Sequence, residues 1–110
     1  MIKIGVDLVL NSRLERNLDD ESFLEKVFHA FEMRDKGKLI SIFALKEATM
    51  KALGKKVGWK EIEVRYDNNG KPEIKLSGVV RPDGFVGIDG SLSHDGEYTV
   101  AIVIIELGNK

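Results

Sequence analysis

The sequence has 110 residues, of which 43% are hydrophobic and 32% are charged, with a formal net charge of −1. These values are typical of one globular domain, which we expect to span residues 1–110. The chain contains no cysteine, which excludes a disulfide framework and a thiolate metal site. The N-terminal stretch is too short for a signal peptide or a membrane span and carries Asp7, so we expect a cytoplasmic protein without membrane contact.

Positive charge is concentrated in one part of the chain. Residues 36–60 contain seven lysines and a single acid, Glu47, for a local balance of +6. Such a run is most often a solvated face, but it also suits a polyanionic small molecule or an acidic partner protein. Arginine is scarce, and the aromatic residues of this segment are only Phe43 and Trp59. Nucleic acid is therefore not an expected partner.

The first predicted element in chain order is a strand over residues 2–10. Alternation places Asp7 on the face opposite the most apolar side chains, beside Gly5, which leaves room for a close approach. A short helix follows, for which Ser12 and Glu15 predict a capping box. A second helical segment begins at Asp19 and Asp20, with an apolar stripe formed by Phe23, Leu24, Val27, Phe28 and Phe31.

The longest predicted helix runs from about Leu39 to Leu53 and is closed by Gly54. Alanines at 44, 48 and 52 recur every four residues, so one side of this helix is thin and can lie close against a sheet. Lys46, Glu47 and Lys51 lie on its other sides. The helix is thus expected to carry both the packing face and the charged residues of the lysine-rich segment.

The C-terminal half is predicted to be mostly β-structure. Residues 60–76 read as a hairpin with the turn "DNNG", residues 77–90 as a loop with short strand pieces, and residues 90–107 as a second hairpin. The segment from Thr99 to Ile105 is apolar or nearly so on both faces, which is typical of a central or doubly covered strand. The sequence therefore predicts an α+β domain with a mainly antiparallel sheet packed by a long helix, and self-association through the apolar strand.

Two carboxylates are candidates for metal chemistry. Glu47 and Lys51 have the spacing of an ordinary i,i+4 helix pair, and Asp7 taken alone is a common strand-end residue. Taken together, carboxylates beside small residues and near lysines suit Mg²⁺ and phosphates. His94, in the last hairpin with Ser91 and Ser93, could hold a phosphate. His29 and Trp59 are interpreted as packing residues, and no zinc spacing or catalytic triad is present.

With these positions in place, the sequence resembles the holo-acyl-carrier-protein synthases, the small bacterial class of 4′-phosphopantetheinyl transferases. The resemblance lies in "GVDLV" (5–9) with Arg13, the helix "FALKEATMKALG" (43–54), "NNGKP" (68–72) and "SLSHDGEYT" (91–99). It extends over nearly the whole chain in the family's order. One departure is Ile42, which stands where the family usually has an arginine before the signature phenylalanine.

The resemblance implies a site and a reaction. Asp7 and Glu47 would hold Mg²⁺ with the pyrophosphate of coenzyme A, Lys51 would neutralise phosphate, and Lys46 would assist. His94 with Ser93 would meet the 3′-phosphate end, Gly70, Lys71 and Pro72 would border the adenine, and Arg13 would face the acidic carrier protein. The implied activity is transfer of 4′-phosphopantetheine to a serine of apo acyl carrier protein in fatty acid biosynthesis, releasing 3′,5′-ADP, by a cytoplasmic homotrimer.

Two other functions fit part of the sequence. A coenzyme A- or nucleotide-binding subunit of the same fold would need no catalysis, although it would leave Asp7, Glu47 and Lys51 without a purpose. A module that binds only an acidic protein through its lysines would need no metal, so Asp7 would have no role. Incubation with coenzyme A, Mg²⁺ and apo carrier protein separates the three, because only the transferase adds mass to the carrier.

Overall fold

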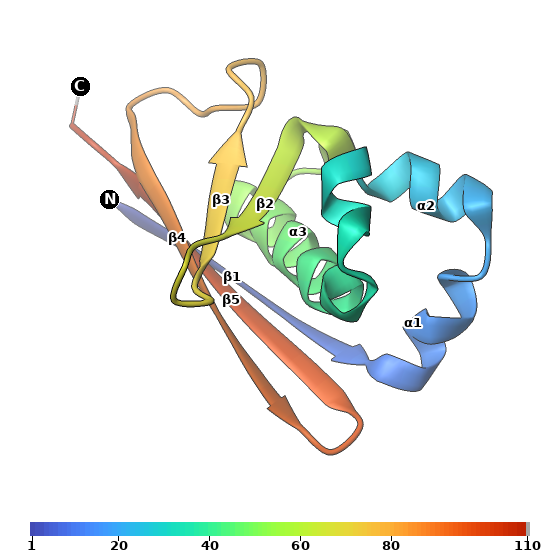
Figure 1. Ribbon diagram of the computed structural model, residues 1–110. Helices are drawn as coiled ribbons and strands as arrows, with labels where there is room; N and C mark the ends of the chain where they lie inside the picture. The colour runs from blue at the N-terminus through green and yellow to red at the C-terminus, as the bar shows by residue number, and fades with distance from the viewer. Residues whose placement is uncertain (110) are drawn as a thin grey trace.

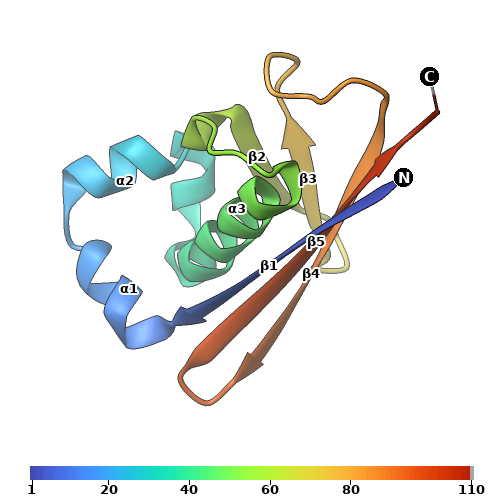
Figure 2. The same cartoon turned by 180° about the vertical axis from the view of Figure 1, so that it is seen from behind.

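The computed structural model describes residues 1–109 and consists of two antiparallel sheets with the helices on one side of the larger sheet (Figures 1 and 2). The larger sheet has the order β1-β5-β4, with β1 (Ile2–Leu10), β4 (Phe85–Asp95) and β5 (Tyr98–Leu107). The hairpin of β2 (Ile62–Tyr66) and β3 (Pro72–Leu76) lies beside β4. The helices are α1 (Asn11–Asn17), α2 (Glu21–Val27) and α3 (Leu39–Leu53), with 3₁₀ turns at Ala30–Arg34, Lys36–Lys38 and Trp59–Glu61. The predicted α+β class is confirmed.

Three element boundaries differ from the sequence prediction. Helix α1 starts at Asn11 without a side-chain cap, so the predicted capping box is wrong. Helix α2 ends at Val27 and Phe28 has extended backbone angles, so the predicted apolar stripe does not continue as one helix to Phe31. The free Val27 carbonyl at this helix end accepts a hydrogen bond from the Lys46 ammonium. Strand β4 begins at Phe85 rather than near Gly90, directly after the positive-φ turn at Gly84.

Helix α3 lies on the inner face of the three-stranded sheet, and its alanines make the contact. Ala44 and Ala48 are fully buried and Ala52 is nearly so. A Cβ added at Gly5 of β1 would lie only 1.9 Å from the carbonyl oxygen of Ala48. The backbones of β1 and α3 therefore touch directly, as the alanine spacing predicted, and only glycine fits at position 5.

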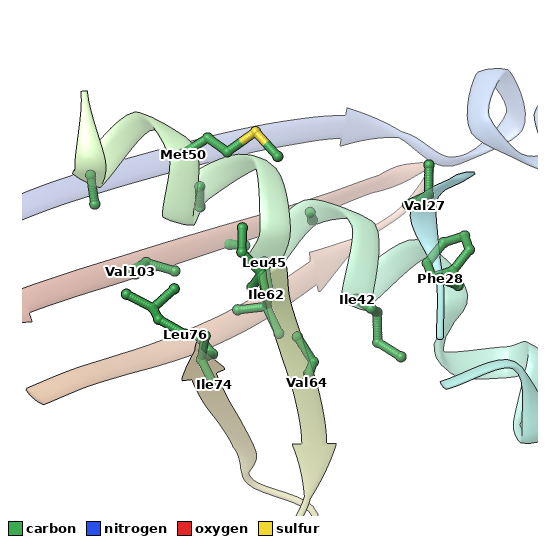
Figure 3. Packing of buried hydrophobic residues seen from close by; sticks show 14 of the residues in the cluster. Val27, Phe28, Ile42, Leu45, Met50, Ile62, Val64, Ile74, Leu76 and Val103 are labelled. Atoms are coloured by element: carbon green, nitrogen blue, oxygen red, sulfur yellow. The ribbon is translucent and has the colours of Figure 1, made fainter. Parts of the chain in front are cut away.

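The core is one cluster between α3, the sheet and the β2–β3 hairpin. Figure 3 shows Leu45 of α3 close to Ile62 and Leu76 of the hairpin, with Val103 of β5 on the sheet side. Ile42 is 2% exposed and lies between Val64 and Phe28 in the same view. The structure describes no helix with the length and apolar composition that a membrane span requires.

The outer face of the three-stranded sheet is also apolar, and nothing in residues 1–109 covers it. Ile4, Val6 and Leu8 of β1 are 60%, 52% and 61% exposed, and Ile102 and Ile104 of the central strand β5 are 42% and 40% exposed. The predicted alternation in β1 is present, with Asp7 opposite these residues, but the more apolar face points away from α3. Contiguous exposed apolar surface of this kind marks an interaction site.

Candidate active site

Asp7 and Glu47 line the same cavity, which has a volume of about 300 Å³. Asp7 projects from β1 toward α3 with 12% of its side chain exposed, and Glu47 is partly buried on α3 beside Ala48. The close approach at Gly5 brings this part of α3 onto β1 and so brings the two carboxylates together. Arg13 of α1 and Phe43 line the same cavity, so Arg13 lies at the carboxylates rather than on a remote surface.

The ammonium of Lys51 bonds to Asp7, not to Glu47 as the helix-pair interpretation expected. Lys51 Nζ lies 3.0 Å from Asp7 Oδ1, and half of the lysine side chain remains exposed. Burial raises the pKa of Glu47, and the negative charge of Asp7 raises it further, whereas Lys51 and Lys56 act in the opposite direction. A partly buried carboxylate whose ionisation is disfavoured by burial and by a neighbouring negative charge is an electrostatic setting that a cation stabilises.

The residues of this cavity fit Mg²⁺. This ion commonly takes one or two protein carboxylates and completes its octahedron with water and substrate phosphates. Within residues 1–109, no group of three or more His, Cys, Asp or Glu side chains could hold a metal without such help. Asp7 and Glu47 would therefore supply two ligands and leave the remaining positions to water and a phosphate-bearing substrate.

A second cavity of about 400 Å³ contains the other predicted contacts. His94, Gly70, Lys71 and Pro72 line it together. The turn before β3 is shaped by Asp67, whose carboxylate accepts hydrogen bonds from the amides of Asn69 and Lys71, and by Gly70, which has a φ of +81°. Ser91, which the sequence analysis named beside His94, also lines this cavity. The remaining lining residues were not predicted for this site and are Lys38, Ser41, Tyr66, Gly90 and Leu92. Two of them had a signal in the sequence, because Lys38 belongs to the lysine-rich segment and Tyr66 ends a strand next to this turn.

A chain of hydrogen bonds fixes the orientation and tautomer of His94. Thr99 Oγ1 donates to Asn11 Oδ1 at 2.8 Å and lies 2.9 Å from His94 Nδ1. Because the single hydroxyl proton of Thr99 is given to Asn11, Nδ1 of His94 must donate its own proton to Thr99. The other ring nitrogen, Nε2, is thereby left for a ligand.

Ser93 does not lie with His94, contrary to the sequence expectation. His94 pairs with Thr99 on the inner face of the sheet, whereas Ser93 pairs with Val100 and faces outward, near Leu8 and Tyr98. Successive residues of a strand point to opposite faces, and Ser93 does not line the cavity that contains His94. The cavities of Glu47 and of His94 likewise share no lining residue.

Lys46 is not available to a phosphate, contrary to the expectation that it would assist Lys51. Its side chain is fully buried, and its ammonium donates to Glu32 Oε1 at 2.8 Å and to the Val27 carbonyl at 2.7 Å. Glu32 is equally buried and also accepts from the amides of His29 and Val64. Burial lowers the pKa of Lys46, with Glu32 opposing the shift. Lys46 therefore joins α3 to the segment before it and to β2.

Comparison with known proteins identifies the family of the chain. Residues 3–103 match the 4′-phosphopantetheinyl transferase superfamily, and the chain belongs to this family. It is 37% identical over 125 aligned positions to a holo-[acyl-carrier-protein] synthase of Ruminiclostridium cellulolyticum, covering 97% of this chain and 93% of the relative. The alignment is longer than this chain, so the relative contains residues that have no counterpart here.

Solved structures give the same result. The holo-[acyl-carrier-protein] synthase of Helicobacter pylori in complex with coenzyme A superimposes with a TM-score of 0.82 at 28% identity, covering 94% of this chain and 99% of that one. The ACPS–coenzyme A complex of Chronobacterium ammoniagenes superimposes with a TM-score of 0.84 at 29% identity, covering 99% of both chains. The predicted family is confirmed.

Replacing Lys46 should reduce stability rather than ligand affinity. Lys46→Met keeps the volume of the side chain but leaves Glu32 buried without its cation, a loss that costs about 3–5 kcal/mol. Urea denaturation should show this decrease, while the exposed Lys55→Met variant should change the free energy of unfolding by less than about 0.5 kcal/mol. A Lys46→Met protein with wild-type stability and weakened coenzyme A binding would restore Lys46 as a phosphate contact.

Glu47 should make the metal-free protein less stable as the pH rises. Its pKa is raised on folding above the ordinary value of 4.5, so its stabilising contribution is complete below that value and is lost as the pH rises through the folded-state pKa. Glu47→Gln has no carboxyl group at this position, so it removes this decrease of stability with rising pH. The free energy of unfolding of the variant, measured in EDTA from about pH 4 to about pH 7, should therefore rise relative to wild type. A difference that is constant or falls with pH would contradict the stated environment of Glu47.

Proposed function

We propose that the protein transfers the 4′-phosphopantetheine group of coenzyme A to a serine hydroxyl of apo acyl carrier protein, in a Mg²⁺-dependent reaction that releases 3′,5′-ADP. The observation that carries the proposal is the cavity that Asp7 and Glu47 line together, with the ammonium of Lys51 3.0 Å from Asp7 Oδ1. The holo-[acyl-carrier-protein] synthases among its relatives and the coenzyme A complexes among its structural neighbours support the transfer. Such an enzyme would act in the cytoplasm, in fatty acid biosynthesis.

Asp7, Glu47 and Lys51 have different roles in the proposed reaction. The serine oxygen of the carrier attacks the phosphorus atom on the pantetheine side of the pyrophosphate, and the bond to the oxygen of 3′,5′-ADP breaks. Mg²⁺ held by Asp7 and Glu47 would supply positive charge to the pyrophosphate. Lys51, exposed enough to turn from Asp7 to a phosphate oxygen, would stabilise the charge that grows on the leaving group. The rate therefore depends chiefly on positioning and electrostatics.

The nucleotide end of coenzyme A is assigned to the second cavity, with His94 Nε2 toward a phosphate and the turn Gly70–Pro72 beside the adenine. Because the two cavities share no residue within one chain, we assign them to neighbouring copies, joined through the exposed apolar face of the sheet. The resemblance favours three copies. This arrangement gives the outward-facing Ile4, Val6 and Leu8 a covering surface.

The transfer itself is the first test. Incubation of the protein with coenzyme A, Mg²⁺ and apo carrier protein should add the mass of phosphopantetheine to the carrier. Glu47→Gln and Asp7→Asn should each lower kcat by about a hundredfold or more, and the double variant should lose little beyond that, because both residues serve one metal. Glu25→Gln, an exposed helical carboxylate, is the control. Near-normal turnover of Glu47→Gln at saturating Mg²⁺ would disprove the metal site.

Arg13 should act on the carrier protein. It is exposed on α1 and lines the carboxylate cavity, so its charge is available to an acidic partner at the point where the serine must enter. Arg13→Ala should raise KM for carrier protein, most strongly at low ionic strength, and leave KM for coenzyme A unchanged. Arg16→Ala on the same helix is the matched control. Weaker coenzyme A binding with an unchanged KM for carrier protein would overturn the assignment.

Sharing of the site between copies is tested by mixing two inactive variants. Light scattering at micromolar concentration should give three times the chain mass, and Val6→Lys on the outer face should give a folded monomer without activity. Subunit exchange between Glu47→Gln and His94→Ala proteins should then restore activity, since mixed oligomers contain interfaces with both residues intact. A wild-type monomer, or mixed oligomers that stay as inactive as the variants, would contradict the shared site.

A further inference from the structure

The ring of His94 is held through a residue at the start of helix α1. Asn11 is the first residue of α1, and its backbone amide donates to the carbonyl of Glu97, in the turn between β4 and β5, at 2.8 Å. Its side-chain oxygen accepts the hydroxyl proton of Thr99, also at 2.8 Å. Thr99 is 1% exposed, so this hydroxyl is shielded from solvent. Asn11 therefore determines the direction in which the Thr99 hydroxyl points.

The direction of this hydroxyl sets the form of the neutral His94 ring. Nδ1 lies 2.9 Å from Thr99 Oγ1, whose proton is given to Asn11, so Nδ1 keeps a proton and Nε2 carries the lone pair. His29 is the opposite case in the same chain. Its Nε2 lies 2.8 Å from the carbonyl of Lys60, which can only accept, so Nε2 carries the proton. The two histidines of the sequence thus have opposite tautomers in their neutral forms.

A lone pair at Nε2 of His94 cannot bind a group that only accepts hydrogen bonds. The oxygens of an ionised phosphate are acceptors, so a ligand of this kind at Nε2 requires a second proton on the ring, taken from solvent. Nδ1 then still donates to Thr99, Nε2 donates to the ligand, and the ring is a cation. Without the Asn11 oxygen, the Thr99 hydroxyl is free to donate to Nδ1. The neutral ring then offers an Nε2–H donor, and no proton is taken up.

We propose that Asn11 is a positioning residue that acts through Thr99 to make the binding of an anionic group at His94 depend on the uptake of one proton. The inference rests on the proposed function for the identity of the ligand, coenzyme A. The hydrogen bonds that carry it lie within one chain. At pH values where the free His94 ring is neutral, the affinity for coenzyme A should fall as the pH rises, because the complex contains one more proton than the free protein. This fall should disappear when residue 11 no longer accepts a hydrogen bond.

The other ionisable side chains around His94 do not supply this pH dependence. Those on the elements and turns next to it are Arg13, Lys38, Tyr66, Lys71, Asp89, Asp95, Glu97 and Tyr98. Lysine and tyrosine ordinarily titrate near about pH 10, carboxylates near about pH 4, and arginine stays charged. The hydrogen bond from Lys71 lowers the pKa of Asp89, and burial raises the pKa of Tyr66, so both move further from neutral pH. All of these groups are the same in every variant compared below.

The tautomer is tested in the protein without ligand. At about pH 8, above the ordinary histidine pKa of about 6.5, ¹⁵N NMR of the ring nitrogens should show the proton of His94 on Nδ1 and that of His29 on Nε2. Asn11→Leu removes the acceptor and should move the His94 proton to Nε2, with His29 unchanged. Thr99→Ser keeps the hydroxyl and should retain the wild-type tautomer. A wild-type His94 with its proton on Nε2 overturns the proposal whether or not the variant folds, and so does an Asn11→Leu protein with the proton still on Nδ1.

Proton uptake is tested by isothermal titration of the full protein with coenzyme A in EDTA. Titrations at about pH 8 in buffers of different ionisation enthalpy should show that wild type takes up about one proton per coenzyme A more than Asn11→Leu. From about pH 7.5 to about pH 8.5 the Kd of wild type should rise by up to about tenfold, as linkage to one proton requires, while that of Asn11→Leu stays nearly constant. Thr99→Ser should follow wild type. The protonation of coenzyme A itself is the same in all three titrations, so equal proton uptake by wild type and Asn11→Leu overturns the proposal.

The outcome is separable from the proposed function. If the wild-type protein binds no coenzyme A, both proposals fail. If it binds coenzyme A with the expected difference in proton uptake but transfers no phosphopantetheine to a carrier protein, only the proposed function fails. If it transfers the group, and Asn11→Leu has the same His94 tautomer and the same proton uptake as wild type, only the present inference fails.

Discussion

The direct backbone contact between β1 and α3 at Gly5 is the constraint on which the site depends. A side chain at position 5 would overlap the carbonyl of Ala48, so any residue other than glycine would push the helix off the strand. Asp7 is two residues along β1 from this contact, and Glu47 is one residue along α3. The two carboxylates share a cavity because the two backbones meet between them. The proposed metal site therefore depends on the absence of a side chain at position 5.

The second constraint is the rotation of α3 about its axis, which the buried Lys46–Glu32 pair holds. Adjacent helical residues point in directions about 100° apart, so Lys46 can be enclosed in the interior while Glu47 faces the cavity. Glu32 also accepts the amides of His29 and Val64 and so links α3 to two neighbouring segments. The adjacent charges of "KE" thus have different tasks, one in packing and one at the site.

Sequence patterns predicted the features that depend on residue spacing along the chain. They did not predict which charged side chains are buried. Three features follow directly from spacing, and the structure shows all of them. They are the alanine repeat of α3, the alternation that separates Asp7 from the apolar side chains of β1, and the "DNNG" turn. The burial of Lys46 could not be predicted, because its partner Glu32 is fourteen residues away and lies in a turn. Ser93 was misplaced although alternation separates it from His94. Both faces of β5 are largely apolar, and the more apolar face of β1 is the exposed one, so hydrophobicity did not indicate which face of the sheet packs on α3.

The exposed apolar face of the three-stranded sheet relates the proposed assembly of the protein to its proposed activity. A chain of 110 residues has few elements, and here all its helices lie on one side of the three-stranded sheet. In the proposed assembly the other side is covered by a second copy of the same chain, which offers a surface of the same apolar character. The carboxylate cavity and the His94 cavity lie apart within one chain. Contact between copies would cover the apolar strands and also bring a nucleotide cavity to a neighbour's carboxylates, so one interface would meet both needs.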